Sequence, residues 1–420
     1  MIRSCTLAAV ILALALASPP AVASDDESLP RFIPGYSPHG LVDTGETNRR
    51  YVPPPPGLLD TALGRRVAQI TVNYNPASCP QGTTTAWPAD ARTAFSYAAS
   101  IWAAILNADR TIEVDACWRN DLPANTLGRA GPARLYRDFT DAPRSGTFYP
   151  VALANEYDGS DLNGSEAEIN ANFNSSFDWY FGTDGATPDT QSDFVTVVLH
   201  ELGHGLGFTG SVSFDDGVAP AECGGTAGTA CYGLDANNRP VIYDRFTEDL
   251  GGNGILSYTS GTTALGNVVT SDDVFFDGTS ANILNGGNRV ELFAPTTWNP
   301  GSSYAHLGEV FNDTEHALMT FSIGRGEAIH YPGRVTIGLF VDMGWDIRNT
   351  ANVVVDASYT GSEETGGPTR PFDTVNEGVK AVYPGGTVTI RNGTYPEEVI
   401  VIRSMLLRAE GTGSSVIGGN

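Results

Sequence analysis

The chain has 420 residues, of which 48 are acidic and 24 are basic, so its formal net charge is −24. This charge disfavours nucleic acids and anionic lipid surfaces as partners, because both would be repelled. Beyond the N-terminal region no run of about 18 uninterrupted apolar residues occurs, so we expect no membrane span in the mature protein.

The first 23 residues have the pattern of a secretory signal peptide. Arg3 precedes an apolar stretch at Leu7–Ala17, and Ala21-Val22-Ala23 is a small-x-small cleavage site. The stretch is too short for a membrane anchor and ends in Pro19-Pro20. We therefore expect a secreted protein, extracellular or periplasmic, that is cleaved after Ala23.

Four cysteines remain after removal of the signal peptide: Cys79, Cys117, Cys223 and Cys231. An even count in an exported chain predicts two disulfides. We favour Cys79–Cys117 and Cys223–Cys231, since each pair lies within one local segment. A cysteine-ligated zinc is the alternative, but the spacings match no zinc ribbon.

Residues 24–65 are polar and rich in proline and glycine, including Pro53–Pro56. This composition predicts an extended linker or a short pro-segment without a core of its own. The segment contains no cysteine, so latency through a cysteine bound to a metal is excluded. Apolar patterns beyond it predict a helix at Pro88–Leu106 and strands at Val67–Tyr74, Thr111–Trp118 and Ala167–Phe173.

Residues 200–208 read HELGHGLGF and contain the zinc-binding pattern HExxH. On a helix, His200 and His204 lie on the same face, so both imidazoles can reach one Zn²⁺ ion. Glu201 follows the first ligand and is placed to accept a proton from water as the general base. The alternative interpretation is two helical histidines that pair with local carboxylates.

The segments around this motif predict an α+β domain at 66–349. A capping box at Thr190–Asp193 is expected to start the motif helix, and Gly205 and Gly207 to end it. Residues 208–304 are rich in Gly, Asn and Asp and predict a long, loop-rich insertion. Three acidic loops could hold Ca²⁺, although solvated loops are the simpler interpretation: 158–164, 214–217 and 271–278.

The metal site is incomplete within the helix. A catalytic zinc takes three protein ligands, and the common extended pattern HExxHxxGxxH puts the third histidine where this chain has Gly210. Glycine offers no ligand atom. The remaining histidines downstream of the helix are His306, His316 and His330, and a carboxylate is a further alternative.

Residues 190–345 resemble the metzincin zinc peptidases of the leishmanolysin-like kind. In these, a long insertion precedes the third histidine, and the chain returns through a methionine-containing turn beneath the metal. The pieces that match are Ser303–Glu309 (SYAHLGE) and Ala317–Phe321 (ALMTF). The resemblance implies His306 as the third ligand and Met319 as the turn methionine. Phe321 stands where the family more often has proline.

The same resemblance bears on three other segments. His316 is the rival ligand, although it lies only three residues before Met319. His330 is more simply a packed or surface histidine. Metzincins bind peptides along an edge strand, and Ala167–Phe173 is the candidate for that strand, where substrate would add by β-augmentation.

Residues 350–420 change character and predict a separate domain. The stretch Pro371–Tyr383 is expected to contain a short helix. Short β-branched runs follow, separated by Gly and Asn turns: 385–390, 392–395, 399–403, 406–408 and 416–419. The patterns PFxTV and PGGTVxIxxGTYxE resemble the start of pectin-lyase-like right-handed β-helix domains. We expect the first rungs of a parallel β-helix, either as a fragment or paired with something else.

The function that these features imply is a secreted zinc-dependent endopeptidase that binds a protein or peptide substrate, with one catalytic Zn²⁺ and Glu201 as the general base. An alternative is a carbohydrate- or surface-binding β-helix protein in which the zinc domain is an accessory. An inactive zinc-stabilised scaffold is a third reading. The intact Glu201 argues against it, since a structural metal has no use for a base.

Overall fold

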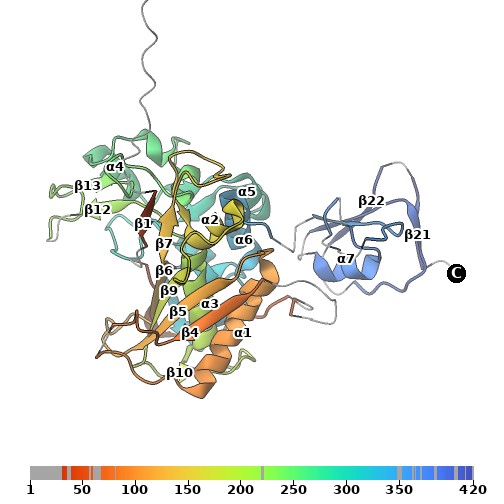
Figure 1. Cartoon of the computed structure of the whole chain (residues 1–420), viewed down its shortest axis with the longest axis horizontal. Helices are drawn as coiled ribbons and strands as arrows, with labels where there is room; N and C mark the ends of the chain where they lie inside the picture. The colour runs from red at the N-terminus through yellow and green to blue at the C-terminus, as the bar shows by residue number, and fades with distance from the viewer. Residues whose placement is uncertain are drawn as a thin grey trace, which may run out of the picture.

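The structure is a computed structural model, and the residues that it describes are 31–35, 39–55, 58–59, 68–80, 82–218, 222–347, 352–361, 364, 366–368, 371–382, 386–401, 405–411 and 413–418. They form a mixture of helices and strands, which confirms the α+β class at the coarse level. The signal peptide at 1–23 and the boundary at 349–350 lie outside the described residues. Figure 1 shows a large unit that contains most of the elements and a small C-terminal unit beside it.

The large unit is built on a four-stranded sheet with the strand order β4-β5-β9-β6. Strands β4 (Ile70–Tyr74), β5 (Ile112–Arg119) and β9 (Ile169–Asn174) lie where the apolar runs predicted strands. The structure shows that these three strands are parallel and that β6 (Gly128–Pro132) is antiparallel to β9. The prediction that Ala167–Phe173 is the edge strand is wrong, because β9 has a neighbour on each side. The two edge strands are β4 and β6, and the sequence of β6, GRAGP, lacks the branched residues that mark a strand. An edge strand tolerates its proline, since one side of the strand forms no ladder.

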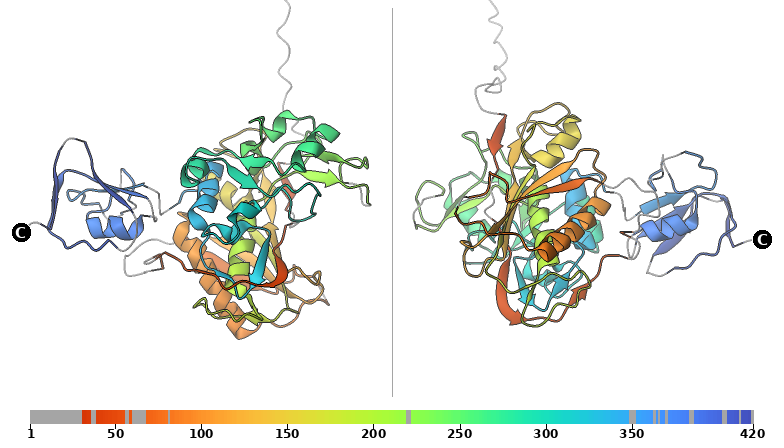
Figure 2. Two further views of the ribbon diagram at one scale, coloured as in Figure 1. Left: turned by 180° about the vertical axis from the view of Figure 1, so that it is seen from behind. Right: turned by 60° about the horizontal axis from the view of Figure 1, so that its bottom comes forward.

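Two helices lie together against this sheet. Helix α1 (Ala89–Ile105) matches the predicted helix, and α3 (Phe194–Leu206) carries the HExxH motif. The indole Nε1 of Trp102 on α1 donates to the carbonyl of Leu199 on α3 at 2.9 Å. Helix α6 (Gly333–Met343) lies near the other end of α3, where the Trp345 indole donates to the Leu206 carbonyl at 2.9 Å. Every residue of α3 is buried, which holds the helix rigidly. Figure 2 shows the ribbon of this helix inside the large unit, with other helices and strands around it.

The region 208–304 is rich in loops, as predicted, but it also carries short elements that pack into the main core. They are β12 (Ser213–Asp215), β13 (Thr229–Cys231), η2 (Tyr243–Phe246), β14 (Thr247–Asp249), η3 (Ile255–Ser257), α4 (Thr263–Val269), β15 (Val274–Phe276), α5 (Thr279–Leu284) and β16 (Val290–Leu292). Strands β14, β15 and β16 form an antiparallel sheet. Tyr243 and Phe276 have no exposed surface. Such short elements carry too few residues to show a period in the sequence.

The described residues of the segment 24–65 are extended, as predicted, but they lie along the large unit and form three strands. Strand β1 (Phe32–Pro34) pairs with β7 (Arg134–Tyr136), which in turn pairs with β8 (Tyr149–Pro150). Strand β2 (Val42–Thr47) is parallel to β17 (Ser322–Arg325), and β3 (Tyr51–Val52) is parallel to β18 (Ala328–Ile329). The side chains of Leu41 and Val52 belong to the main core. These described residues therefore belong to the folded unit and do not form a free linker.

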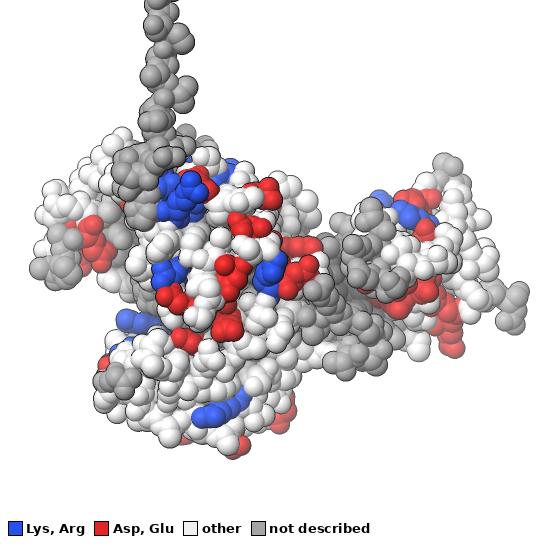
Figure 3. All heavy atoms as spheres, in the orientation of Figure 1, with Lys and Arg blue, Asp and Glu red and all other residues white. Residues whose placement is uncertain are grey.

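The remaining elements of the large unit are α2 (Val151–Asp158), β10 (Trp179–Tyr180), β11 (Ser192–Asp193), η4 (Glu309–Phe311) and η5 (Ala317–Met319). The cysteines pair as predicted, Cys79 with Cys117 and Cys223 with Cys231, at Cα–Cα distances of 5.7 and 5.4 Å. Among the described residues, no helix has the length and apolar character needed to cross a bilayer. Figure 3 shows acidic side chains on both units, beside fewer basic ones.

The C-terminal unit has its own core. Strands β19 (Asn352–Val355), β20 (Thr387–Ile390) and β22 (Leu406–Ala409) are parallel, and β21 (Gly393–Tyr395) is parallel to β23 (Ser415–Ile417). Helix α7 (Val375–Ala381) starts at a capping box formed by Thr374 and Glu377. The predicted strand at 399–403 is absent from its described residues 399–401. Stacked parallel strands and a short helix agree with the sequence patterns, while the described strands form two open sheets.

The two cores predict that the large unit folds without the C-terminal one, since the cluster ending at Ile347 shares no residue with the cluster beginning at Val353. A chain ending at Asn349 should keep the thermal unfolding midpoint of the large unit within about 2 °C, because a loss of 1 kcal/mol would shift it by about 2–4 °C. Scanning calorimetry of both chains measures this. An insoluble truncated chain, or a midpoint lowered by about 10 °C, would show that the C-terminal unit supports the large one.

Candidate metal centre

Helix α3 begins one turn later than the predicted capping box. Its N-cap is Asp193, whose Oδ1 accepts a hydrogen bond from the Thr196 amide at 2.8 Å. Asp193 is fully buried, and the same oxygen accepts from Nε2 of His330 at 2.9 Å. Thr190 lies upstream in a turn, so the prediction of a capping box at Thr190–Asp193 is wrong. His330 is thus a packed residue that supports the start of the motif helix.

A glycine terminates the C-terminal end of α3. Gly207 ends the helix, as predicted, with φ of 125°, a conformation that other residues rarely adopt. This turn brings the carbonyl of Phe208 back to Nδ1 of His204, at 2.6 Å. The bend that ends the helix therefore also orients one histidine of the motif.

The structure brings His200, His204 and His306 together, although His306 is far away in the sequence. The Nε2 atom of His204 lies 3.0 Å from that of His200 and 3.2 Å from that of His306, and the third separation is 3.3 Å. All three side chains are fully buried. This trio is one of two groups of potential metal ligands among the described residues.

The hydrogen bonds of these rings fix where their protons are. Each Nδ1 lies 2.6–2.7 Å from a backbone carbonyl, namely those of Leu318, Phe208 and Ser302. A carbonyl can only accept, so each Nδ1 carries the proton and each neutral ring has a lone pair on Nε2. Burial lowers the pKa of all three rings, to about 4 for His204, which keeps them neutral.

Three lone pairs that face one another at these distances repel unless a cation lies among them. The short Nε2 contacts cannot be hydrogen bonds, since none of the three atoms has a proton to give. Histidines that bind a metal through Nε2 commonly donate their Nδ1–H to a backbone carbonyl, as here. The donor set therefore fits a divalent metal ion that favours imidazole nitrogen.

The packing of the segment that leads to His306 explains why the usual third-ligand position is occupied by Gly210. A Cβ on Gly210 would lie 2.2 Å from the ring of Tyr304, so glycine leaves room for that ring two residues before His306. The Tyr304 hydroxyl donates to Oδ1 of Asp244 at 3.1 Å, and the Ser211 amide donates to the same oxygen at 2.9 Å. Asp244 thus joins the end of α3 to the segment that delivers His306.

Asp244 and Tyr304 support the arrangement of the candidate site, and the sequence did not reveal them. Burial raises the pKa of Asp244 to about 6. Asp244 is one of many acidic residues in a Gly- and Asp-rich region, and Tyr304 is an ordinary aromatic in the sequence. The positive φ of Tyr304, 73°, is also invisible there.

Met319 lies directly beneath the motif helix. It is fully buried in η5, and a Cβ added to Gly203 of α3 would meet its Sδ at 2.7 Å. The preceding residue, Leu318, supplies the carbonyl that accepts from His200. The Leu307 amide donates to the Met319 carbonyl at 2.8 Å, which ties this turn to the segment of His306.

Glu201, the residue after His200, is fully buried. Its Oε1 accepts a hydrogen bond from the Leu41 amide at 3.1 Å. Burial raises the pKa of its carboxyl to about 8. Gly128 at the start of β6 leaves room for it, since a Cβ there would lie 3.2 Å from the same oxygen.

His316 lies outside the trio. It ion-pairs with its neighbour Glu315 at 3.7 Å when protonated, and burial lowers its pKa to about 4. The three acidic loops considered for Ca²⁺ contain no cluster of three His, Cys, Asp or Glu side chains among the described residues. The second such cluster is Glu364, Asp373 and Glu377 in the C-terminal unit.

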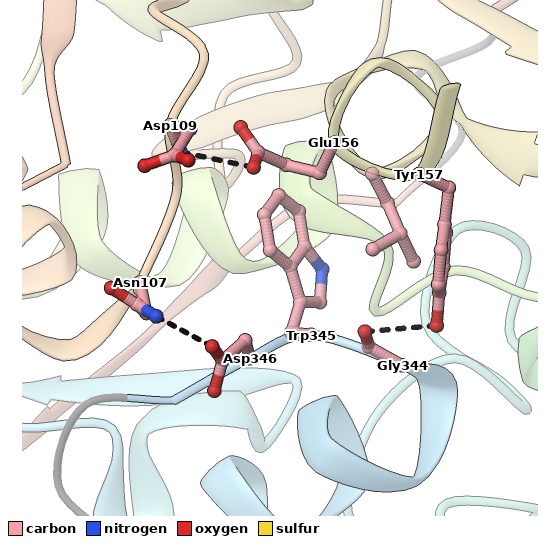
Figure 4. A pocket seen from close by; sticks show the side chains of 8 residues that line it. Asn107, Asp109, Glu156, Tyr157, Gly344, Trp345 and Asp346 are labelled. Atoms are coloured by element: carbon pink, nitrogen blue, oxygen red, sulfur yellow. Dashed lines mark hydrogen bonds between the residues drawn. The ribbon is translucent and has the colours of Figure 1, made fainter. Parts of the chain in front are cut away.

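A cleft of about 260 Å³ lies elsewhere in the large unit, around Trp345 (Figure 4). Its polar groups largely satisfy one another. Glu156 accepts from the Asp109 amide at 2.9 Å, and the Tyr157 hydroxyl donates to the Gly344 carbonyl at 3.0 Å. None of the three clustered histidines lines it. We therefore place the functional site at the histidines and not at this cleft.

The buried N-cap of α3 predicts a large stability effect. Asp193→Ala should lower the free energy of unfolding by about 2–4 kcal/mol, because it removes the cap and leaves the buried His330 without its acceptor. The control is Asp90→Ala in the exposed first turn of α1, which should cost less than about 1 kcal/mol. Urea denaturation of the metal-free proteins measures both. Equal midpoints for Asp193→Ala and wild type would contradict this account of the helix start.

Comparison with known proteins adds a family match for part of this region. Residues 77–221 match a family model described as SPBPB7E8-like. The matched stretch contains His200, Glu201 and His204 and stops before His306. No curated protein and no solved structure matches the chain.

Proposed function

We propose that the protein is a secreted zinc-dependent endopeptidase whose metal is held by His200, His204 and His306. The observation that carries the proposal is the convergence of three neutral imidazoles, each with Nδ1–H donated to a carbonyl and its Nε2 lone pair turned inward. The trio excludes the pairing of helical histidines with carboxylates. A Glu directly follows the first histidine, which favours a catalytic over a structural metal.

The donor set favours zinc among divalent ions. Zinc binds imidazole at about 2.0–2.1 Å in a tetrahedral arrangement, which separates two ligand nitrogens by about 3.3–3.4 Å. The Nε2 atoms here are 3.0–3.3 Å apart. Three protein ligands also leave one position for water or substrate, as catalytic zinc sites require. Ca²⁺ and Mg²⁺ prefer oxygen ligands, so they fit this trio poorly.

The reaction would rely on Glu201 for its proton transfers. A zinc ion at this site supplies Lewis acidity, which polarises a peptide carbonyl and acidifies a water molecule. Glu201 accepts a proton from the attacking water through its carboxylate and returns it to the nitrogen of the leaving amine. Its position on the rigid, buried α3 keeps the carboxylate in register with the histidines of the same helix.

The arrangement around the trio supports the leishmanolysin-like metzincin resemblance. Met319 lies under the helix, and His306 arrives after the region 208–304. In the C-terminal unit, the stacked parallel strands support the proposal that residues 350–420 begin a β-helix domain. The two disulfides support export, because such bonds persist in oxidising compartments.

The ligand assignment predicts the metal content of two matched variants. The wild-type protein should contain about one zinc per chain, and His306→Ala should lose most of it, since two imidazoles hold zinc weakly. His316→Ala removes a histidine that lies outside the trio and should keep the zinc. Inductively coupled plasma mass spectrometry after dialysis measures both. Zinc lost from His316→Ala and kept by His306→Ala would reverse the assignment.

The proposed base predicts a separation of metal binding from catalysis. Glu201→Gln should keep both zinc and fold but cleave an unstructured peptide about 10²- to 10⁴-fold more slowly than the wild type, because the amide cannot accept the proton. Peptide hydrolysis followed by mass spectrometry, with zinc content measured on the same samples, tests this. Similar cleavage rates in mutant and wild type would rule out Glu201 as the base.

A further inference from the structure

The candidate metal centre is closed in this structure. His200, Glu201, His204 and His306 have no exposed surface, so a peptide cannot reach them without a rearrangement. Part of the cover is residues 39–47, here called the N-terminal strap, which consists of His39, Gly40, Leu41 and strand β2. The strap precedes the sheet in sequence, yet it runs across the site that the sheet and α3 build.

The strap lies between two segments, residues 125–127 and 321–325, and forms backbone hydrogen bonds to both. We call these two segments the walls, and the space between them, which the strap fills, the groove. On one wall, the Leu127 amide donates to the Leu41 carbonyl at 2.9 Å, and the Asp43 amide donates to the Asn125 carbonyl at 3.0 Å. This wall leads into the edge strand β6, and the strap is antiparallel to it, as the bridge between Val42 and Thr126 shows.

The other wall is the segment that follows Met319. The Val42 amide donates to the Phe321 carbonyl at 3.1 Å, and β2 then runs parallel to β17. An ion pair between Asp43 and Arg325 at 3.0 Å adds to this side. An extended chain thus satisfies both walls through main-chain groups, which is how a peptide adds to a sheet edge irrespective of its sequence.

The strap also contacts the reactive groups themselves. The Leu41 amide occupies Oε1 of Glu201, the carboxylate proposed to handle the protons. The ring of His39 lies against two of the clustered histidines, with centroid distances of 5.4 Å to His204 and 6.1 Å to His306. A backbone amide and an imidazole of the chain therefore stand where substrate and water would have to enter.

We propose that the groove between residues 125–127 and 321–325 is the binding site for an extended peptide substrate, and that the strap occupies it in the intact chain and keeps the enzyme latent. This inference rests on the proposed endopeptidase function. Latency here needs no cysteine, because main-chain pairing and His39 provide the cover. Activation requires only that the strap leave the groove, by displacement or by cleavage.

Gly40 offers a way to release the strap without touching the metal site. A Cβ at this position would lie 2.4 Å from the carbonyl oxygen of Gly128 and 2.7 Å from Cγ of Arg129, and the carbonyl belongs to the backbone of β6 and cannot move aside. Gly40→Ala in the full chain should therefore push residues 39–41 out of the groove. The matched control is Gly254→Ala, where an added Cβ meets nothing nearer than 3.8 Å. His39→Ala is a milder second variant.

The test uses zinc-loaded full-length proteins and three measurements: hydrogen exchange of residues 39–47, the rate at which a chromogenic chelator removes zinc, and hydrolysis of a short unstructured peptide. Gly40→Ala should raise all three, with at least a tenfold gain in hydrolysis, and His39→Ala should speed zinc removal. Gly254→Ala should match the wild type. A synthetic peptide with the sequence of residues 38–48 should inhibit Gly40→Ala competitively.

Two results would overturn the latency, and they differ from a failure of the proposed function. One is faster exchange of the strap in Gly40→Ala with hydrolysis no faster than that of an already active wild type. The other is no change in exchange or zinc removal in either variant. If exchange and zinc removal both rise and no peptide is cut, the strap does cover the metal, and it is the endopeptidase function that fails.

Discussion

The site depends on the complete burial of helix α3. A helix that is buried on all sides cannot turn or slide, so His200 and His204 keep their places on one face while α1, α6 and the sheet enclose the rest. Within that enclosure each imidazole is kept neutral and each Nδ1 proton is committed to a carbonyl. Burial therefore does two things together: it holds the three imidazoles in position and leaves Nε2 as the nitrogen of each ring with a free lone pair, as the proposed zinc site requires.

The third histidine reaches this helix through contacts that are local in space and distant in sequence. Gly210 makes room for Tyr304, Asp244 ties Tyr304 to the end of α3, and the turn at Met319 provides the carbonyl under His200 and a hydrogen bond to the His306 segment. The region 208–304 is therefore a folded connection. Its short strands and helices belong to the main core, and this fixes where the chain re-enters the site.

The N-terminal strap is also held by segments that are distant in the sequence. On one side it pairs with residues 125–127, which lead into the edge strand β6, and on the other side it pairs with the segment that follows Met319. Two facing lines of backbone groups would be left without partners if no chain lay between them, so an extended chain of suitable length can pair with both. In this protein the segment nearest in the fold is its own N-terminal strap, and its pairing explains how a stretch rich in proline and glycine becomes ordered.

The sequence alone determined the local features: the HExxH helix with Glu201, three strands of the main sheet, the helix at Ala89–Ile105 and both cysteine pairs. The helix, the strands and the HExxH motif follow from spacings of a few residues, and the cysteine pairs follow from the strong tendency of cysteines in an exported chain to form disulfides. The tertiary structure decided the rest. It gathered His306 rather than His316 with the motif and moved the helix cap to Asp193. It also placed β9 inside the sheet with β6 at an edge, and laid residues 39–47 over the site. Each of these depends on contacts between segments that are distant in the sequence, and local sequence patterns do not show which distant segments come into contact.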